Sequence, residues 1–156
     1  MAAKKMAIIA TKGTLDMAYP PLILASTAAA LGWDVQIFFT FYGLQLLRKD
    51  LSDVKISPLA NPAMPMPVPM PVMVQMLPGM ESMATMMMKQ KMKSKGVASL
   101  EELRALCLEA DVKFVACQMT VDLFEFDKKD FIDGIEYGGA ATFMKFAGET
   151  DVCLFI

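Results

Sequence analysis

Short runs rich in apolar residues recur along the chain, and most of the intervals between them hold a helical pattern. The runs are residues 6–10, 34–39, 112–117 and 151–156. The first has no polar alternation, which is typical of a strand buried on both faces of a parallel sheet. Strands that alternate with helices predict an α/β fold, a doubly wound, mainly parallel sheet with helices on both faces.

The length of 156 residues suits one domain with a sizeable core. We expect a single domain over residues 1–156, interrupted by a Pro/Met-rich insertion at 57–96. Eleven of the 16 methionines fall between residues 64 and 92. Residues 61–71 favour extended polyproline II, and Pro78 is well placed to begin a helix.

Local signals predict where two core helices begin and end. Thr14 is the expected N-cap of a helix that ends at Gly32, with Pro20 and Pro21 in its early turns. A second helix starts at Ser99, because Glu102 three residues later completes a capping box. Its expected buried stripe is Leu100, Leu103, Leu106, Cys107 and Ala110.

Charge and composition exclude several classes of function. A net charge of −2 gives no basic face for phosphates, so we expect no nucleic-acid partner. Histidine is absent, which removes Ser-His-Asp and Cys-His catalysis and all histidine-based metal sites. Three cysteines without a CxxC pair match neither a disulfide framework nor a zinc ribbon. We therefore expect no metal site and no cofactor.

The apolar content is high: 55% of the residues are hydrophobic and the mean hydropathy is +0.42. A subunit interface or a membrane surface is expected to cover the excess. The uncharged stretch 56–80 is long enough to span a bilayer, but its seven prolines exclude a spanning helix. The apolar run at 6–10 is too short for a signal peptide. We expect a cytoplasmic protein with reduced thiols.

The three cysteines differ in position. Cys107 and Cys153 are expected to be small core residues. Cys117 ends a buried strand directly before a short helix expected from about Thr120, with Asp122 in its first turn. Ligands bind at the carboxyl ends of parallel strands, and a thiol beside a helix N-terminus gains thiolate character. Position alone leaves both a reactive and a merely buried Cys117 open.

A lone activated thiolate without a histidine base is unsuited to hydrolysis. It can take up, hold and pass on a sulfur atom, or sense an oxidant.

Two glycine loops follow strands and open helices, so their N–H groups could hold an anion. Tight turns that require glycine are the favoured explanation, since neither loop has a dinucleotide or Walker pattern. A nucleotide site also lacks an acidic partner for the ribose. The candidate binding residues are Lys12, Gly13, Thr14, Gln118, Met119, Thr120, Gly138 and Gly139.

The Met-rich segment has three interpretations. Its thioethers could bind Cu(I), although no Cys or His joins them. Residues 62–92 could instead contact a membrane surface peripherally or grip a partner helix, with four lysines following the methionines. The third interpretation is an oligomer interface or lid, which also explains the apolar composition. Met80, Met83 and Met87 are predicted to share one face of the helix in this segment.

Several motifs in combination resemble the DsrE/DsrF-like family, in its Met-rich branch named peroxiredoxin-like. They are Lys12-Gly13-Thr14-Leu15-Asp16, Phe39-Thr40-Phe41-Tyr42-Gly43-Leu44, Ala116-Cys117-Gln118-Met119-Thr120-Val121-Asp122, Gly138-Gly139-Ala140-Ala141-Thr142-Phe143 and the closing residues 151–156. The resemblance extends over essentially the whole chain, including the insertion.

The resemblance implies a small DsrEFH-type α/β fold that assembles into homo-oligomers. It implies a sulfur carrier or sulfurtransferase, in which the family's sulfur-carrying cysteine falls on Cys117. That cysteine would hold sulfane sulfur as a persulfide or thiosulfonate and exchange it with TusA-like or rhodanese-type carrier proteins. Some members use another cysteine in the insertion, which has none here. The alternative function is a non-catalytic oligomeric interaction or membrane-surface protein that uses the Met-rich segment.

Overall fold

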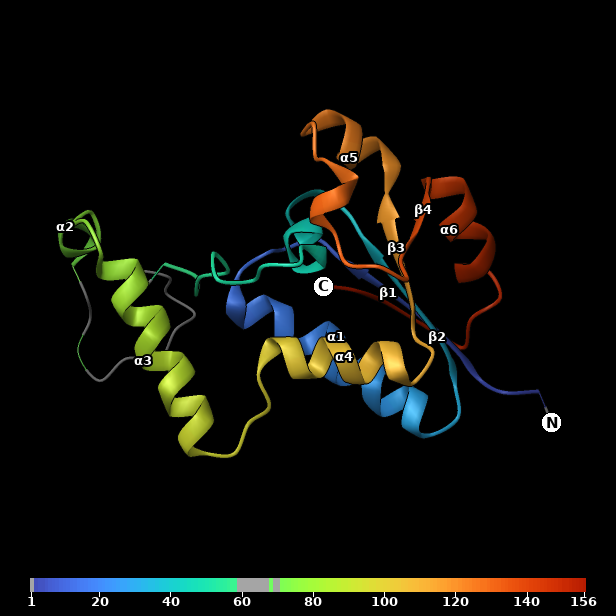
Figure 1. The fold of residues 1–156 in the computed structure, drawn as a ribbon. Helices are drawn as coiled ribbons and strands as arrows, with labels where there is room; N and C mark the ends of the chain where they lie inside the picture. Colours follow the sequence, from blue (N-terminus) through green and yellow to red (C-terminus); the bar gives the residue numbers. More distant parts are fainter. Residues whose placement is uncertain (1, 59–67, 69–70) are drawn as a thin grey trace.

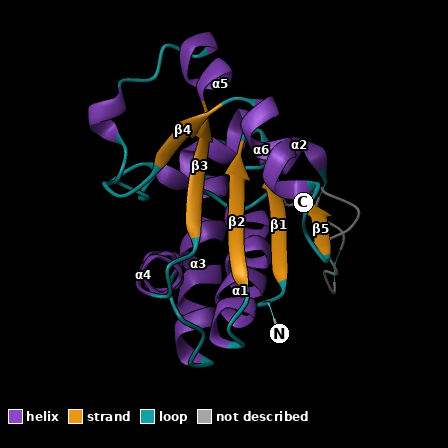
Figure 2. Ribbon diagram, turned by 90° about the vertical axis from the view of Figure 1, so that its right-hand side faces the viewer, coloured by secondary structure: helices purple, strands orange, loops and turns teal. Residues whose placement is uncertain are grey.

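The chain folds around a five-stranded, fully parallel sheet with the strand order β4-β3-β2-β1-β5 (Figure 2). A computed structural model describes residues 2–58, 68 and 71–156. The strands are β1 (Lys5–Ala10), β2 (Asp34–Phe39), β3 (Lys113–Cys117), β4 (Glu136–Gly138) and β5 (Val152–Phe155). The predicted α/β fold with a mainly parallel sheet is confirmed.

Helices cover both faces of the sheet, as expected. Within the described ranges they are α1 (Leu15–Ala30), α2 (Val72–Gln75), α3 (Met80–Ser94), α4 (Leu100–Glu109), α5 (Gln118–Leu123) and α6 (Ala140–Ala147), with the 3₁₀ helices η1 (Phe41–Leu47) and η2 (Lys128–Asp130). Helices α1 and α4 lie together on one face, and α6 lies on the other (Figure 1).

Side-chain alternation along the strands divides the core into two clusters. Ile8 and Ile37 pair across β1 and β2, and both are fully buried in the larger cluster beneath α1 and α4. Ala7 and Phe38, which point to the opposite face, pack with Phe143 of α6. The Phe38 and Phe143 rings stack with their centroids 4.8 Å apart. Strands covered on both faces account for the unbroken apolar runs in the sequence.

Helix α1 ends where the sequence predicts. Gly32 has a φ of +80°, a conformation that glycine adopts without a Cβ penalty. The N–H of Gly32 bonds to the Ala29 carbonyl at 2.9 Å, and that of Trp33 to the Ala28 carbonyl at 3.1 Å. This is the Schellman pattern of helix termination.

The beginning of α1 differs in detail from the prediction. Thr14 is the N-cap, but its hydroxyl caps no backbone N–H; instead its oxygen lies 3.2 Å from that of Ser57, whose hydrogen goes to the Asp16 carboxylate. Pro20 and Pro21 both lie inside the helix, which continues through them. The first turn is thus held by a distant segment of the chain.

The insertion forms a helical pair, α2 and α3, that extends away from the sheet (Figure 1). The prediction that Pro78 begins a helix is wrong, because Gly79 turns the chain with a φ of +88° and α3 starts after it. The polyproline II prediction falls mostly outside the described residues. In the part of the chain that the structure describes, no helix is both long and apolar enough to cross a membrane.

The packing face of α3 is not the predicted methionine face. Thr85 is buried and donates to the Glu81 carbonyl at 2.8 Å while accepting the Ile56 N–H at 3.0 Å. Met83 and Met87 are exposed. The face that meets the core instead carries Ala84, Thr85, Met88 and Met92, and the bond from the Ile56 N–H to Thr85 fastens it there.

Helix α4 begins with the predicted capping box, in which Ser99 and Glu102 each accept the other's backbone N–H. The predicted buried stripe is partly wrong, since Leu106 and Ala110 are exposed. Arg104 is buried in their place and donates to the carbonyls of Leu46 at 2.9 Å and Arg48 at 2.6 Å. This guanidinium thus provides hydrogen bonds for the backbone carbonyls at the end of η1.

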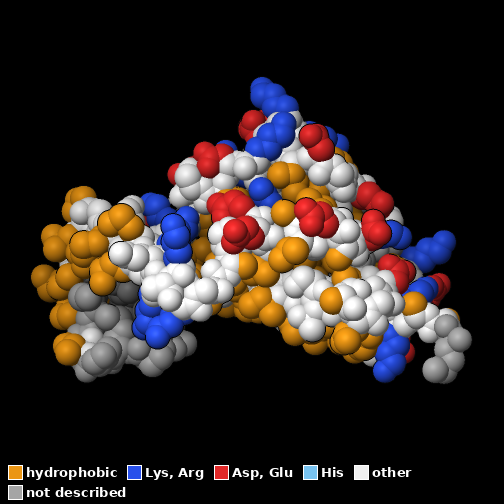
Figure 3. Space-filling view, turned by 60° about the horizontal axis from the view of Figure 1, so that its bottom comes forward, with side chains coloured by type: hydrophobic (Ala, Val, Ile, Leu, Met, Phe, Trp, Pro, Cys, Tyr) orange, Lys and Arg blue, Asp and Glu red, His pale blue; other side chains and the backbone are white. Residues whose placement is uncertain are grey.

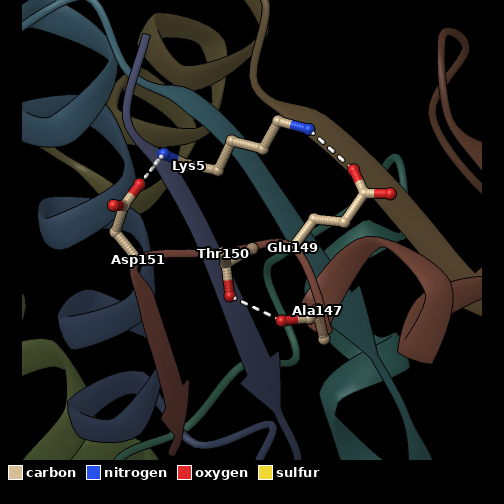
Figure 4. A network of polar contacts seen from close by, with 5 residues as sticks. All are labelled: Lys5, Ala147, Glu149, Thr150 and Asp151. Carbon is tan, nitrogen blue, oxygen red and sulfur yellow. Dashed lines mark hydrogen bonds and ion pairs between the residues drawn. The ribbon is translucent and has the colours of Figure 1, made fainter. Parts of the chain in front are cut away.

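Polar contacts fasten the connection between α6 and β5 to the start of β1 (Figure 4). The Lys5 N–H donates to Asp151 at 2.8 Å, and the Lys5 ammonium pairs with Glu149 at 2.9 Å. The Thr150 hydroxyl donates to the Ala147 carbonyl at 2.7 Å. The pair raises the pKa of Lys5 and lowers that of Glu149, chiefly through their hydrogen bond.

Candidate functional site

Cys117 lies at the carboxyl end of β3 and is also the N-cap of α5, so strand and helix meet at this residue. Its side chain is 4% exposed and packs in the smaller core cluster with Val115 and Phe143. β3 is an inner strand of the sheet. The thiol is therefore held at the edge where ligands bind in open parallel sheets.

Two threonines from different elements surround the Cys117 sulfur. Thr120, in α5, is completely buried, and Thr40 follows β2 directly. Their hydroxyl oxygens are 3.2 Å apart, and the Phe41 N–H donates to the Thr120 hydroxyl at 3.3 Å. Thr40 follows Phe39, the register partner of Ala116, so it adjoins Cys117, and Thr120 lies in the first turn of the helix that Cys117 caps.

The pKa of the Cys117 thiol lies below its ordinary value. Burial raises the pKa, but hydrogen bonds from the hydroxyl and N–H of Thr120, the hydroxyl of Thr40 and the N–H of Met119 lower it by more. Hydrogen bonds to a charged form favour that form. Cys117 thus combines a protected position with increased thiolate character.

The other two cysteines have different environments. Cys107 is fully buried, as predicted, and its thiol donates to the Leu22 carbonyl at 3.3 Å. Burial raises the pKa of Cys107 to about 11. Cys153 is exposed, so the prediction of a core position is wrong. The reason is that β5 is an edge strand and Cys153 faces outward with Phe155, which is 74% exposed.

The second glycine loop adjoins Cys117 directly. Gly138 of β4 is the register partner of Cys117, and Gly139 is the N-cap of α6. A Cβ on Gly138 would lie 3.3 Å from a methyl group of Val115, whereas a Cβ on Gly139 would meet open space. Only Gly138 is constrained by a close approach.

The first glycine loop lies elsewhere. Lys12, Gly13 and Thr14 line a hollow of about 310 Å³ together with Met17, Tyr42, Gln45 and Ser57, and Cys117 is not part of it. A Cβ on Gly13 would overlap the Tyr42 carbonyl oxygen. Close packing of two loops therefore requires this glycine, in agreement with the tight-turn interpretation.

Gln118, which follows Cys117, links two charged side chains. Its amide donates to Asp122 at 2.6 Å, and its carbonyl oxygen accepts from the Lys128 ammonium at 2.9 Å. Lys128 also lies 4.2 Å from the centre of the Tyr137 ring. Asp122 is not in a first helical turn, because α5 starts at Gln118 rather than Thr120.

An exposed apolar surface surrounds these residues. Met119 is 63% exposed, and the rings of Phe41, Tyr42 and Phe124 lie 6.0–6.4 Å from one another. Phe41 has a φ of +50°, a rare conformation for a bulky residue. Such strain is maintained only where the surrounding structure requires it.

Of the predicted site residues, Cys117, Gln118, Met119, Thr120 and Gly138 lie together at the carboxyl ends of β3 and β4. Sequence reasoning gave no role to Thr40, which lies 80 residues before Thr120. The sequence shows that Thr40 directly follows an apolar run, but only the sheet order shows that this strand neighbours β3.

Comparisons with known proteins agree with this architecture. A family model described as the DsrE/DsrF/DrsH-like family matches residues 2–155. The chain is 67% identical over 160 residues to "Sulfur carrier protein DsrE2" of Allochromatium vinosum, with 100% of both chains covered. It is 35% identical over 157 residues to the uncharacterized protein YrkE of Bacillus subtilis, covering 98% of this chain and 97% of that protein.

Among solved structures, the crystal structure of the ychN protein from E. coli has the same fold, with a TM-score of 0.56 at 12% identity. The similarity covers 98% of this chain and 99% of that chain. The match of the family model over nearly every residue and the 67% identity to the A. vinosum protein lead to one conclusion: the chain belongs to the DsrE/DsrF/DrsH-like family.

Proposed function

We propose that this protein is a sulfur carrier that holds sulfane sulfur on Cys117 and passes it to an acceptor thiol. The observation that carries the proposal is the hydrogen-bonded thiol at the carboxyl end of β3. The relative from A. vinosum, named a sulfur carrier protein, supports it. A carrier needs a thiolate that reacts reversibly, and lowering the pKa of a thiol provides one.

Loading is a thiol exchange without net oxidation. The Cys117 thiolate attacks the sulfane sulfur of a donor persulfide, forming a new sulfur–sulfur bond while the donor bond breaks. The bonding electron pair leaves with the donor thiolate, and the terminal sulfur keeps its charge or takes a proton from water. In release, an acceptor thiolate attacks that terminal sulfur and the Cys117 thiolate leaves.

A thiosulfonate forms in the same way. The Cys117 thiolate attacks a central sulfur of tetrathionate, and thiosulfate leaves with the electron pair of the broken bond. Both loaded forms keep the carried sulfur on one cysteine, so the chemistry needs no second cysteine in the insertion.

The direct test is to incubate the reduced protein with polysulfide or tetrathionate and to map the modified peptide by mass spectrometry. We expect added sulfur, or a thiosulfonate group, on Cys117. Cys117→Ser should abolish loading, whereas Cys153→Ser, the matched exposed control, should leave it intact. Loading of the Cys117→Ser protein on Cys107 or Cys153 would contradict the assignment.

For the partners, we propose a homo-oligomer in the cytoplasm that exchanges sulfur with TusA-like or rhodanese-type proteins. Exposed apolar side chains support an assembly: Phe155 is 74% and Met144 61% exposed. Cys117 itself is almost covered, so an acceptor must approach the apolar surface around Met119 closely. Sedimentation velocity of the purified protein tests the oligomer, and a monomer at micromolar concentration would exclude it.

A second candidate function is peripheral attachment to an anionic membrane through α2 and α3. Hydrophobic side chains gather at this end of the molecule (Figure 3). The exposed ones are Val68, Val72, Met73, Met76, Leu77, Met83, Met86 and Met87. Four exposed lysines follow them along α3 and its C-terminus: Lys89, Lys91, Lys93 and Lys95. Apolar side chains beside cations are the combination that binds anionic lipid surfaces.

Co-sedimentation with phosphatidylglycerol vesicles tests this function. Binding should be lost when Met83, Met86 and Met87 are all changed to Gln, but kept in Met144→Gln, an exposed methionine on α6. If the unaltered protein stays in the supernatant, membrane attachment is excluded. The methionine surface is then left for a subunit interface.

A further inference from the structure

The hydroxyls of Thr40 and Thr120 have few hydrogens to share among their contacts. A backbone N–H can only donate, so the Thr120 oxygen is the acceptor in its bond from Phe41. The Thr120 hydrogen must therefore point elsewhere. Its other two neighbours are the Thr40 oxygen, at 3.2 Å, and the Cys117 sulfur.

A thiolate accepts hydrogen bonds and donates none, which limits the arrangements. Either both hydroxyls donate to the sulfur, or one donates to the other and the second donates to the sulfur. Thr40 donates directly to the sulfur when both hydroxyls do so or when Thr120 donates to Thr40; in the remaining arrangement it donates to Thr120, which in turn donates to the sulfur. Thr120 is fully buried and Cys117 is 4% exposed, so the described structure offers water little access to replace a missing donor.

We infer that Thr40 is a second thiolate-binding residue of the Cys117 site, contributed by the end of β2, and that its main effect is on the release of sulfur. This inference rests on the proposed function for the release step alone. The thiolate-binding role concerns the protein without any sulfur loaded on it.

The emphasis on release follows from where the negative charge lies. In the persulfide, the charge is carried by the terminal sulfur, and it returns to the Cys117 sulfur only as the acceptor attacks. Donors fixed at that sulfur therefore stabilise the leaving group, and a thiol of lower pKa leaves faster.

Loading responds differently, because there Cys117 is the nucleophile. A lower pKa increases the fraction of thiolate but decreases its intrinsic reactivity. At a pH above the pKa the thiol is already ionised, so the fraction of thiolate no longer changes with the pKa. Loss of the Thr40 hydroxyl should then leave loading unchanged or slightly faster, and still slow release.

The test compares Thr40→Val, which removes the hydroxyl at nearly constant volume, with Thr40→Ser, which restores it. Thr85→Val is the matched control, a buried threonine on α3 whose hydroxyl bonds Ile56 and Glu81. The first readout is the pH profile of Cys117 alkylation by iodoacetamide, resolved by peptide mass spectrometry. The second is the rate at which cyanide removes sulfur from the persulfide, forming thiocyanate and the Cys117 thiolate.

Thr40→Val should move the alkylation profile to higher pH. Below the pKa the fraction of thiolate falls about tenfold for every pH unit by which the profile moves, but the intrinsic reactivity of the thiolate rises about threefold, so the alkylation rate should fall about threefold. Cyanolysis should slow by a similar order, Thr40→Ser should recover both rates, and Thr85→Val should match the unaltered protein. Thr40→Ala replaces Thr40→Val, with the same expectation, if circular dichroism shows that Thr40→Val does not fold.

An unchanged alkylation profile in Thr40→Val, or no recovery in Thr40→Ser, overturns the thiolate-binding role. Cyanolysis that does not slow despite a displaced profile overturns the emphasis on release. Failure of the unaltered protein to load polysulfide contradicts the proposed function instead, and leaves the alkylation result standing on its own.

Discussion

The carboxylate of Asp16 binds Ser57 twice, accepting its N–H at 2.9 Å and its hydroxyl at 2.8 Å. This contact joins the first turn of α1 to the chain segment that leads into the insertion. Burial raises the pKa of Asp16, but the hydrogen bonds from Ser57 and Thr14 lower it by more.

Asp16 therefore makes stability depend on pH. Because its pKa is lower in the folded chain, its contribution is complete above the ordinary value of 3.8 and is lost as the pH falls through the lower folded value. Asp16→Asn should reduce the free energy of unfolding by about 1 kcal/mol at pH 7, since the half-buried site is partly screened by water. Urea titrations at pH 7 and pH 3 measure the difference in free energy of unfolding between the unaltered protein and Asp16→Asn. An equal difference at both pH values would contradict the pH dependence assigned to Asp16.

Arg104 should be a main determinant of the packing between α4 and η1. Arg104→Met keeps much of the apolar stem but leaves the Leu46 and Arg48 carbonyls without their donor. We expect a loss of about 2–3 kcal/mol in the free energy of unfolding. Lys91→Met, at an exposed position on α3, is the control and should change it by less than about 0.5 kcal/mol. Equal effects of the two substitutions would show that the carbonyl contacts contribute little.

Gly43 tests the close approach of the loops that follow β1 and β2. A Cβ at this position would overlap the Ala10 carbonyl oxygen, so Gly43→Ala must displace one of the two loops. We expect destabilisation of about 2 kcal/mol or more, read as a lower midpoint in thermal unfolding. Gly139→Ala places a Cβ in open space and should leave the midpoint nearly unchanged. A stable Gly43→Ala protein would disprove the tight packing.

Cys153 and Cys107 should label in distinct ways. Cys153 is exposed and should react with iodoacetamide because it is accessible, whereas Cys107 is fully buried with a pKa of about 11. Cys107 should therefore react only after unfolding in denaturant. Peptide mapping after labelling at pH 8 gives the order in which the cysteines react with iodoacetamide. Labelling of Cys107 in the folded protein would show that α4 opens from the sheet.

The sequence predicts local features of this protein well. The apolar runs identify β1, β2 and β3, because strands covered on both faces are largely apolar, and a similar run identifies the half-exposed edge strand β5. The Ser99 capping box and the Gly32 helix end are also predictable, since each depends on residues within one or two helical turns. The position of Cys117 at a strand end is likewise local.

Features that depend on distant segments are decided only by the tertiary structure. The burial of Arg104 depends on carbonyls more than 50 residues away, and the exposure of Cys153 depends on which edge of the sheet β5 occupies. Thr40 and Thr120 meet at the sulfur because β2 and β3 are neighbours with aligned carboxyl ends. The sequence by itself thus determined the strands and the candidate thiol. The sheet order determined the environment of that thiol, because hydrogen bonds between strands join residues that no local pattern connects.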